Sequence, residues 1–101
     1  MILNTYQKLV LNNGKEVKLT LNFARLLKVK NNNKEMYEKC NEVMMNGAKD
    51  IFDMLLVIYT SYLCANLEDE VIKYEEFIEL VPFNLKSIAV LTDSLMTSKK
   101  K

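Results

Sequence analysis

The fold is decided by residues 48–65, which read AKDIFDMLLVIYTSYLCA. Apolar side chains recur in this stretch every three or four residues, the spacing of an amphipathic helix. They form two adjacent stripes, Ile51, Leu55, Ile58, Tyr62 and Phe52, Leu56, Tyr59, Leu63. A helix that is apolar around most of its circumference is either central to a fold or covered by a partner.

The residues before this helix predict a β-hairpin over about 5–22. Apolar and polar side chains alternate from Glu16 to Phe23, which is typical of a half-buried strand, and a second apolar strand ends at Leu11. A lone hairpin is marginally stable in water, so its apolar face is expected to lie on helices or on another chain.

The turn of the hairpin lies within residues 12–15, Asn-Asn-Gly-Lys, and allows two registers. A three-residue turn closed by Gly14 sets Leu9 opposite Val17, whereas a two-residue turn sets Val10 opposite Val17. We favour the first register, because it gathers the leucines of both strands on one face.

Four further helices are predicted, at residues 24–30, 34–45, 74–81 and 85–96. Residues 31–33, Asn-Asn-Asn, are expected to interrupt the first two, since Asn favours turns over helix interiors. Gly47 suits a C-cap, Pro82 ends a helix and Asn84 suits an N-cap. The prediction is an α+β, mainly α fold with one domain over 1–101: a hairpin, then a compact set of four to five helices that includes a long central one at about 48–65. Residues 97–101 are expected to form a disordered basic tail.

Composition excludes several classes of function. The chain of 101 residues is 50% apolar, has a formal net charge of +1 and contains no His. The balanced charge disfavours nucleic-acid binding, and the missing His excludes histidine-based metal sites and catalytic triads. The longest apolar run is far shorter than the roughly 20 residues that span a bilayer. We therefore expect no cofactor, no metal, no nucleic acid and no membrane partner.

Enzymatic chemistry is also poorly represented. Cys40 and Cys64 are widely spaced and predict reduced, inert thiols in a cytosol rather than a nucleophile. Glu75 and Glu76 are adjacent on a helix, so they point in different directions and favour a solvated face over an acid–base pair. We expect no catalytic residues.

The remaining feature is a surplus of apolar side chains. Methionines cluster around the junction of the helices at 34–45 and 48–65, and Met is frequent on surfaces that accept varied apolar partners. They fit either a core or a groove that receives an amphipathic helix. For the groove, the predicted partner-binding residues are Met44, Met45, Phe52, Leu55, Leu56, Tyr59 and Tyr62.

The layout resembles a known family. The chain begins with a hairpin that contains the strand Lys-Glu-Val-Lys-Leu-Thr-Leu (residues 15–21), and a long central apolar helix follows. Next come the segment Tyr-Glu-Glu-Phe-Ile-Glu-Leu-Val-Pro (residues 74–82) and a last amphipathic helix. This order resembles the tail assembly chaperones of long-tailed bacteriophages, notably those that infect Gram-positive hosts.

The resemblance implies a function and a location. Such a chaperone binds the tape measure protein, a long, helical and apolar-rich chain, and keeps it soluble until the tail tube assembles. It would work in the host cytoplasm and be absent from the mature virion. We also expect self-association into oligomers along the client.

The family further implies a frameshifted, longer form of the chain as a second product. Residues 99–101, Lys-Lys-Lys, fit a slippery A-rich codon run or simply a solubilising tail. Two alternatives from other classes remain at this point: a small structural or connector protein of the virion, and a regulatory nucleic-acid-binding protein, which the near-neutral charge disfavours.

Overall fold

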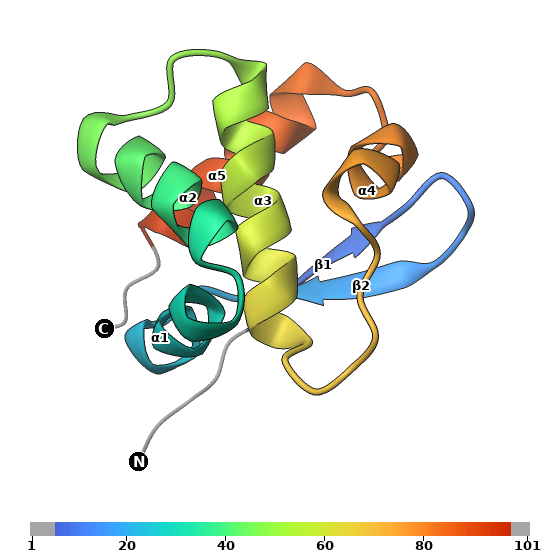
Figure 1. Ribbon diagram of the computed structural model, residues 1–101. Helices are drawn as coiled ribbons and strands as arrows, with labels where there is room; N and C mark the ends of the chain where they lie inside the picture. Colours follow the sequence, from blue (N-terminus) through green and yellow to red (C-terminus); the bar gives the residue numbers. More distant parts are fainter. Residues whose placement is uncertain (1–5, 98–101) are drawn as a thin grey trace.

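Helix α3 (Ile51–Ala65) lies at the centre of the computed structural model, which describes residues 6–97. It packs against the four other helices and against strand β2. In Figure 1, α1 and α2 cover one side of α3, α4 and the hairpin cover another, and α5 crosses behind it. The other elements are β1 (Gln7–Val10), β2 (Glu16–Leu19), α1 (Phe23–Asn32), α2 (Lys34–Asn46), α4 (Tyr74–Leu80) and α5 (Leu85–Met96). The predicted α+β, mainly α class is confirmed.

The hairpin has the register favoured from the sequence. Leu9 lies opposite Val17, and the turn is closed by hydrogen bonds from the Gly14 N–H to the Leu11 carbonyl and from the Leu11 N–H to the Lys15 carbonyl, both 2.8 Å. Gly14 has φ +87°, a backbone conformation that other L-residues rarely adopt. The strands cover only 7–10 and 16–19 of the predicted 5–22, and residue 5 lies outside the described residues.

Asn and Asp side chains define where the helices begin. Asn22, Asn33, Asp50 and Asn84 each accept a hydrogen bond from the backbone N–H three residues later. An N-cap side chain satisfies one of the free N–H groups of the first helical turn. The central helix consequently begins at Ile51, three residues later than the predicted start at residue 48. The predicted N-cap at Asn84 is confirmed.

One prediction about the segment before α2 is wrong. Phe23 does not continue the strand inward; because Asn22 caps α1, Phe23 is its first residue and is almost fully exposed. The predicted interruption by the asparagines is confirmed, but it comes at Asn33 and not at residue 31. Helix α1 continues to Asn32, and only Asn33 separates it from α2, with its N–H bonded to the Val29 carbonyl.

The ends of the remaining segments agree closely with expectation. Gly47 is the C-cap of α2, with φ +88° and its N–H bonded to the Val43 carbonyl, as predicted. Helix α4 ends at Leu80, one residue earlier than predicted, and α5 has its predicted bounds. Of the predicted tail 97–101, only Thr97 lies within the described residues, as the C-cap of α5.

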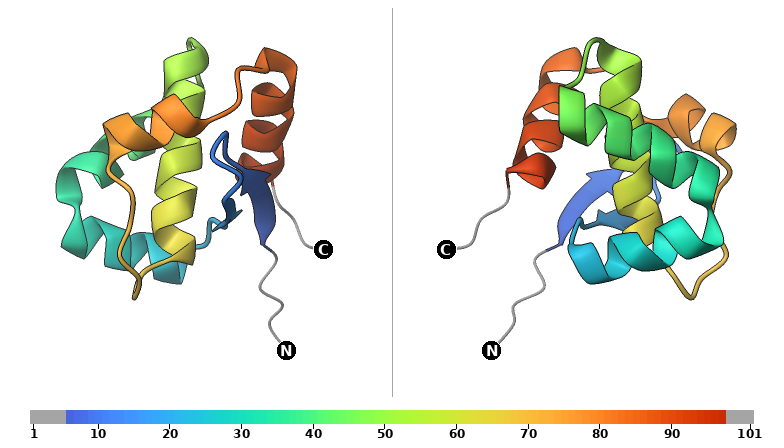
Figure 2. Two further views of the ribbon diagram at one scale, coloured as in Figure 1. Left: turned by 90° about the vertical axis from the view of Figure 1, so that its right-hand side faces the viewer. Right: turned by 60° about the vertical axis from the view of Figure 1, so that its left-hand side comes forward.

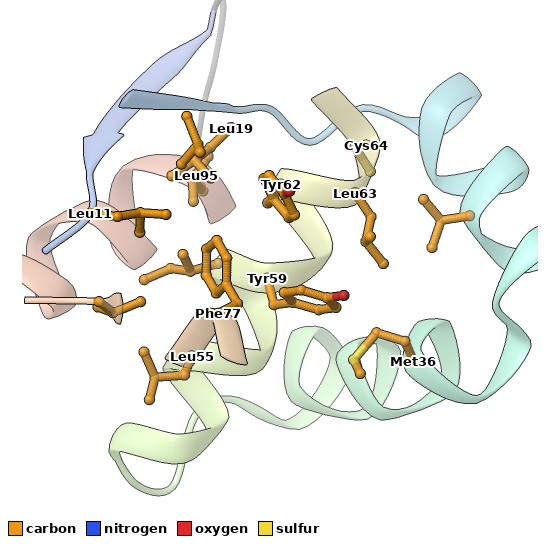
Figure 3. Packing of buried hydrophobic residues seen from close by; sticks show 14 of the residues in the cluster. Leu11, Leu19, Met36, Leu55, Tyr59, Tyr62, Leu63, Cys64, Phe77 and Leu95 are labelled. Carbon is orange, nitrogen blue, oxygen red and sulfur yellow. The ribbon is translucent and has the colours of Figure 1, made fainter. Parts of the chain in front are cut away.

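The main core surrounds α3 and takes buried residues from the hairpin and from the other four helices, including Leu26 and Val29 of α1 and Met36 of α2. Figure 3 shows Leu11, Leu19 and Leu95 approaching Tyr62 and Phe77 from different elements. Phe77 and Leu19 are fully buried, so the apolar face of the hairpin rests on the helices of its own chain. The fold thus buries most of both apolar stripes of α3 and leaves Phe52 as their exposed member.

Candidate functional site

The seven predicted partner-binding residues divide into three groups in the structure. Leu55, Tyr59 and Tyr62 are buried, Met44 and Leu56 are half-buried, and Met45 and Phe52 are exposed. Burial removes the first three from any surface of the folded chain. The structure therefore does not bring the seven residues together as one surface.

Tyr59 and Tyr62, which come from the two different stripes of α3, are core residues because the aromatic side chains of α4 cover both of them. Phe77 stacks on the Tyr62 ring with 4.9 Å between ring centroids and meets the Tyr59 ring edge-on at 5.2 Å. Tyr74 also meets Tyr59 edge-on at 5.2 Å. Aromatic pairs at such separations contribute roughly 0.5–1.5 kcal/mol beyond the area they bury.

Both tyrosine hydroxyls hold the segment that follows α3. The Tyr59 hydroxyl donates to the Ile72 carbonyl at 2.6 Å, and the Ile72 N–H donates to the Tyr62 hydroxyl at 2.8 Å. Burial raises the pKa of Tyr59 to about 12, with a smaller rise from Tyr62. These two side chains thus fix residues 66–73 against α3 and have a structural role.

Met44 and Leu56 belong to a second, smaller apolar cluster. They pack with Leu21 and Met96 around the buried residues Cys40, Val43 and Val57. Met44 comes from α2, Leu56 from α3 and Met96 from α5, so the cluster joins these three helices. Part of each of these side chains still reaches solvent.

Met45 and Phe52 are 75% and 60% exposed. They lie at the end of α2 and the start of α3, and the start of α5 lies at this same end of α3 in Figures 1 and 2. Two more exposed apolar residues lie here, Leu85 at the start of α5 and Phe83 just before its N-cap, the latter 92% exposed. We call these four residues, Met45, Phe52, Phe83 and Leu85, the apolar end surface.

Sequence reasoning missed half of this surface. Neither Leu85 nor Phe83 was among the predicted partner-binding residues. A signal was nevertheless present, because Phe83 lies between a helix-stopping Pro82 and the N-cap Asn84, where no helical period buries it. Phe23 and Leu27 of α1 form a separate exposed pair, one turn apart on the same face.

The two thiols lie away from solvent. Cys40 and Cys64 are free and fully buried. Burial raises the pKa of the Cys64 thiol to about 12; Cys40 adds to the rise and Arg25 opposes it. Burial likewise raises the pKa of Cys40, and the Thr60 hydroxyl partly opposes this rise. A thiol held neutral is a poor nucleophile.

No protein-family model, curated protein or solved structure matches this chain. Among residues 6–97, no group of three or more His, Cys, Asp or Glu side chains is arranged to hold a metal ion. The helices in this range are all too short or too polar to span a bilayer. Glu75 and Glu76 are exposed in the first turn of α4.

Proposed function

We propose that the chain is a binding protein for an apolar helical client, and that the apolar end surface receives it. The observation that carries this proposal is the exposure of Met45, Phe52, Phe83 and Leu85. These residues belong to, or directly precede, the end of α2, the start of α3 and the start of α5, which lie at the same end of the molecule in Figures 1 and 2. Apolar side chains gathered on a surface are typical of interaction sites.

The particular function that we propose is that of a phage tail assembly chaperone acting on the tape measure protein. The segment at residues 74–82 and the order of hairpin, central helix and last helix support this assignment. The predicted setting is the host cytoplasm, with the protein absent from finished virions. Mass spectrometry of purified virions that finds this chain at stoichiometric levels would contradict the proposal and favour a connector protein.

The size of the surface suits weak, repeated binding. Four apolar side chains offer on the order of 400 Å² of apolar area, worth about 10 kcal/mol in gross terms. Association costs an estimated 4–15 kcal/mol, so one copy binds one client segment weakly. Several copies along one long client gain affinity from avidity, which fits a chaperone that coats an extended helix.

The flexible side chain of Met45 suits an apolar client. Met is unbranched and adapts to different apolar partners. Charged residues also flank the apolar end surface in the sequence, because Lys49 and Asp50 precede α3 and Lys86 follows Leu85. The apolar stripe of the client is therefore the main feature recognised in this proposal.

Co-expression with a tape measure fragment, followed by pull-down, tests the proposal. Phe52→Asp and Met45→Asp are expected to weaken client capture at least about tenfold while leaving the fold intact, because both side chains are exposed. Phe23→Asp is the matched control: it changes an even more exposed Phe, in α1 near the opposite end of α3, and should capture client normally. Tyr59→Asp is unsuitable, since Tyr59 is buried.

Two results would contradict the proposal. One is a tape measure fragment that is equally soluble with and without this protein. The other is equal loss of capture in the Phe23 and Phe52 variants, which would locate binding away from the apolar end surface. The predicted frameshifted form is tested separately, by the nucleotide sequence that encodes residues 99–101 and by the reading frames that overlap it.

A further inference from the structure

The two edges of the hairpin have different surroundings. The outer edge of β2 is covered by α3: the Thr20 N–H donates to the Ser61 carbonyl at 3.1 Å, and the Asn66 side chain reaches the Lys18 carbonyl at 3.4 Å. The outer edge of β1 is closed only beyond the strand, where the Asn12 N–H donates to the Leu80 carbonyl at 2.7 Å.

The turn determines which backbone groups point to the open edge. Leu11 and Lys15 form a hydrogen-bonded pair, so by alternation Leu9 with Val17 is also hydrogen-bonded, whereas Lys8 with Lys18 is not. The N–H and C=O of Lys8 and Val10 therefore point away from β2. Within residues 6–97 these groups have no hydrogen-bond partner.

A cavity opens beside this edge on the core-facing side of the sheet. It measures about 420 Å³ and is lined by Gln7, Lys86, Ser87, Val90, Leu91 and Ser94. The Gln7 side chain donates to the Ser94 hydroxyl at 2.9 Å and joins β1 to α5 across its floor. Val90 is exposed on α5, so the wall that faces the open edge is partly apolar.

We propose that a second copy of this chain pairs with β1 through its own β1, in the antiparallel direction with Leu9 opposite the partner's Leu9. This register places Lys8 opposite the partner's Val10, and Val10 opposite the partner's Lys8, in hydrogen-bonded pairs. It is the only register in which all outward-facing backbone groups of β1 bond to β1 of the partner. The two hairpins then form one four-stranded sheet.

Charge favours the same register. Lys8 opposite the partner's Lys8 would place like charges side by side, which is destabilising across strands. With Leu9 on the axis, the partner's Lys8 lies beside Val10, whose other neighbour across the sheet is Glu16. Glu16 already attracts Lys8 of its own chain, with 3.8 Å between Nζ and Oε2. Opposite charges thus flank Val10, a residue that is 54% exposed in the monomer.

Pairing also covers apolar surface on the core-facing side of the sheet. A two-fold axis perpendicular to the sheet keeps both α5 helices on the same side, so the added strand covers the cavity beside Val90 and Leu91. A lone two-stranded hairpin is marginal and its edge invites pairing, whereas four strands over helices form a stable layer. The interface does not use the apolar end surface, so this inference does not depend on client binding.

Two substitutions of opposite charge at residue 10, Val10→Lys and Val10→Glu, test the pairing in the purified protein without client. Val10→Lys places like charges together at two symmetric contacts and should raise the dimer dissociation constant about 2- to 30-fold, measured by sedimentation equilibrium. Val10→Glu should lower it. The effects on the monomer have the reverse order, because residue 10 faces Glu16 within the chain. General destabilisation cannot produce this reversal.

Disulfide cross-linking tests the register directly. The native thiols are buried, so a single introduced Cys is the reactive one. Lys8→Cys mixed with Val10→Cys should form a covalent dimer, because Cα atoms of a hydrogen-bonded pair lie about 5.5 Å apart. Val10→Cys alone should cross-link poorly, since its two copies lie diagonally across the sheet.

Three results would overturn the proposal. They are a wild-type chain that stays monomeric at millimolar concentration, charge variants that shift association in the same direction, and cross-linking that is equal in mixed and single samples. Amide exchange of Lys8 and Val10 that is slowed by an added client peptide and not by protein concentration would assign the edge to the client instead.

Discussion

The hydrogen bonds from Tyr59 and Tyr62 to Ile72 allow a sharp test of the core. Tyr59→Phe removes the hydroxyl that donates to the Ile72 carbonyl at 2.6 Å, and Tyr62→Phe removes the acceptor of the Ile72 N–H at 2.8 Å. Neither change alters the ring packing against Phe77. The measured difference therefore reports the hydroxyl alone.

The expected magnitude follows from the two contacts. Each hydrogen bond contributes about 1 kcal/mol, so each single variant should lower the melting temperature by about 4–8 °C. The double variant should cost less than the sum, because loss of either bond already releases Ile72. Tyr37→Phe is the matched control: the Tyr37 ring is half-buried but its hydroxyl makes no hydrogen bond to a described residue, so stability should change by less than about 0.5 kcal/mol.

The same hydroxyl predicts a dependence of stability on alkaline pH. The pKa of Tyr59 is about 12 in the folded chain, above the usual value of about 10. The contribution of this raised pKa to the free energy of unfolding is fully present below about pH 10. It is lost as the pH rises from about 10 to about 12, because the hydroxyl ionises more readily in the unfolded chain. Tyr59→Phe should therefore flatten part of the stability loss in this window.

Thermal and urea unfolding followed by circular dichroism measure these changes. Hydrogen exchange at the Ile72 amide and limited proteolysis of residues 66–73 locate the effect. If Tyr59→Phe and Tyr62→Phe match Tyr37→Phe in all of these measurements, the assignment of a structural role to the two hydroxyls is wrong.

Three further predictions concern the rest of the fold. Cys40 and Cys64 should resist alkylation in the native protein and react fully in denaturant, because both are buried with raised pKa values; rapid native alkylation would contradict their burial. Gly14→Ala should destabilise the chain by about 1–2 kcal/mol in urea titration, because its φ of +87° strains a residue that has a Cβ. The added methyl group meets no neighbouring atom, so this loss measures backbone strain alone. Asn33→Ala should cost about 1 kcal/mol by loss of the α2 cap, whereas Asn31→Ala, inside α1, should be neutral or slightly stabilising; equal effects would argue against the cap.

Much of the secondary structure followed from local rules in the sequence. The hairpin register depended on the turn at Gly14, and the start of α5 on Asn84, each governed by residues within one turn of the chain. At residues 22–23 two local signals competed, the alternation of a strand and the N-cap of a helix. The alternation from Glu16 extended the strand to Phe23, but the Asn22 side chain bonded to the Arg25 N–H and began a helix instead.

The candidate site was only partly predictable. Helical spacing placed Phe52, Leu55 and Tyr59 on neighbouring stripes of one apolar helix, and no local feature ranked these stripes by burial. Phe77 and Ile72, which lie more than ten residues further along the chain, cover Tyr59 and leave Phe52 exposed. Phe83 was not predicted as a surface residue, because it lies in the short connection between α4 and α5, where no helix or strand periodicity indicates burial or exposure.

The sequence by itself determined the class of fold, the central position of the long apolar helix, the hairpin register and most helix ends, because these depend on spacing, caps and turns within a few residues. Only the tertiary structure decided which apolar side chains of α3 are core and which are surface, and that the edge of β1 is left open. Burial and edge coverage depend on segments far apart in the chain, such as Leu80 beside Asn12 and Ser61 beside Thr20, which no local pattern specifies.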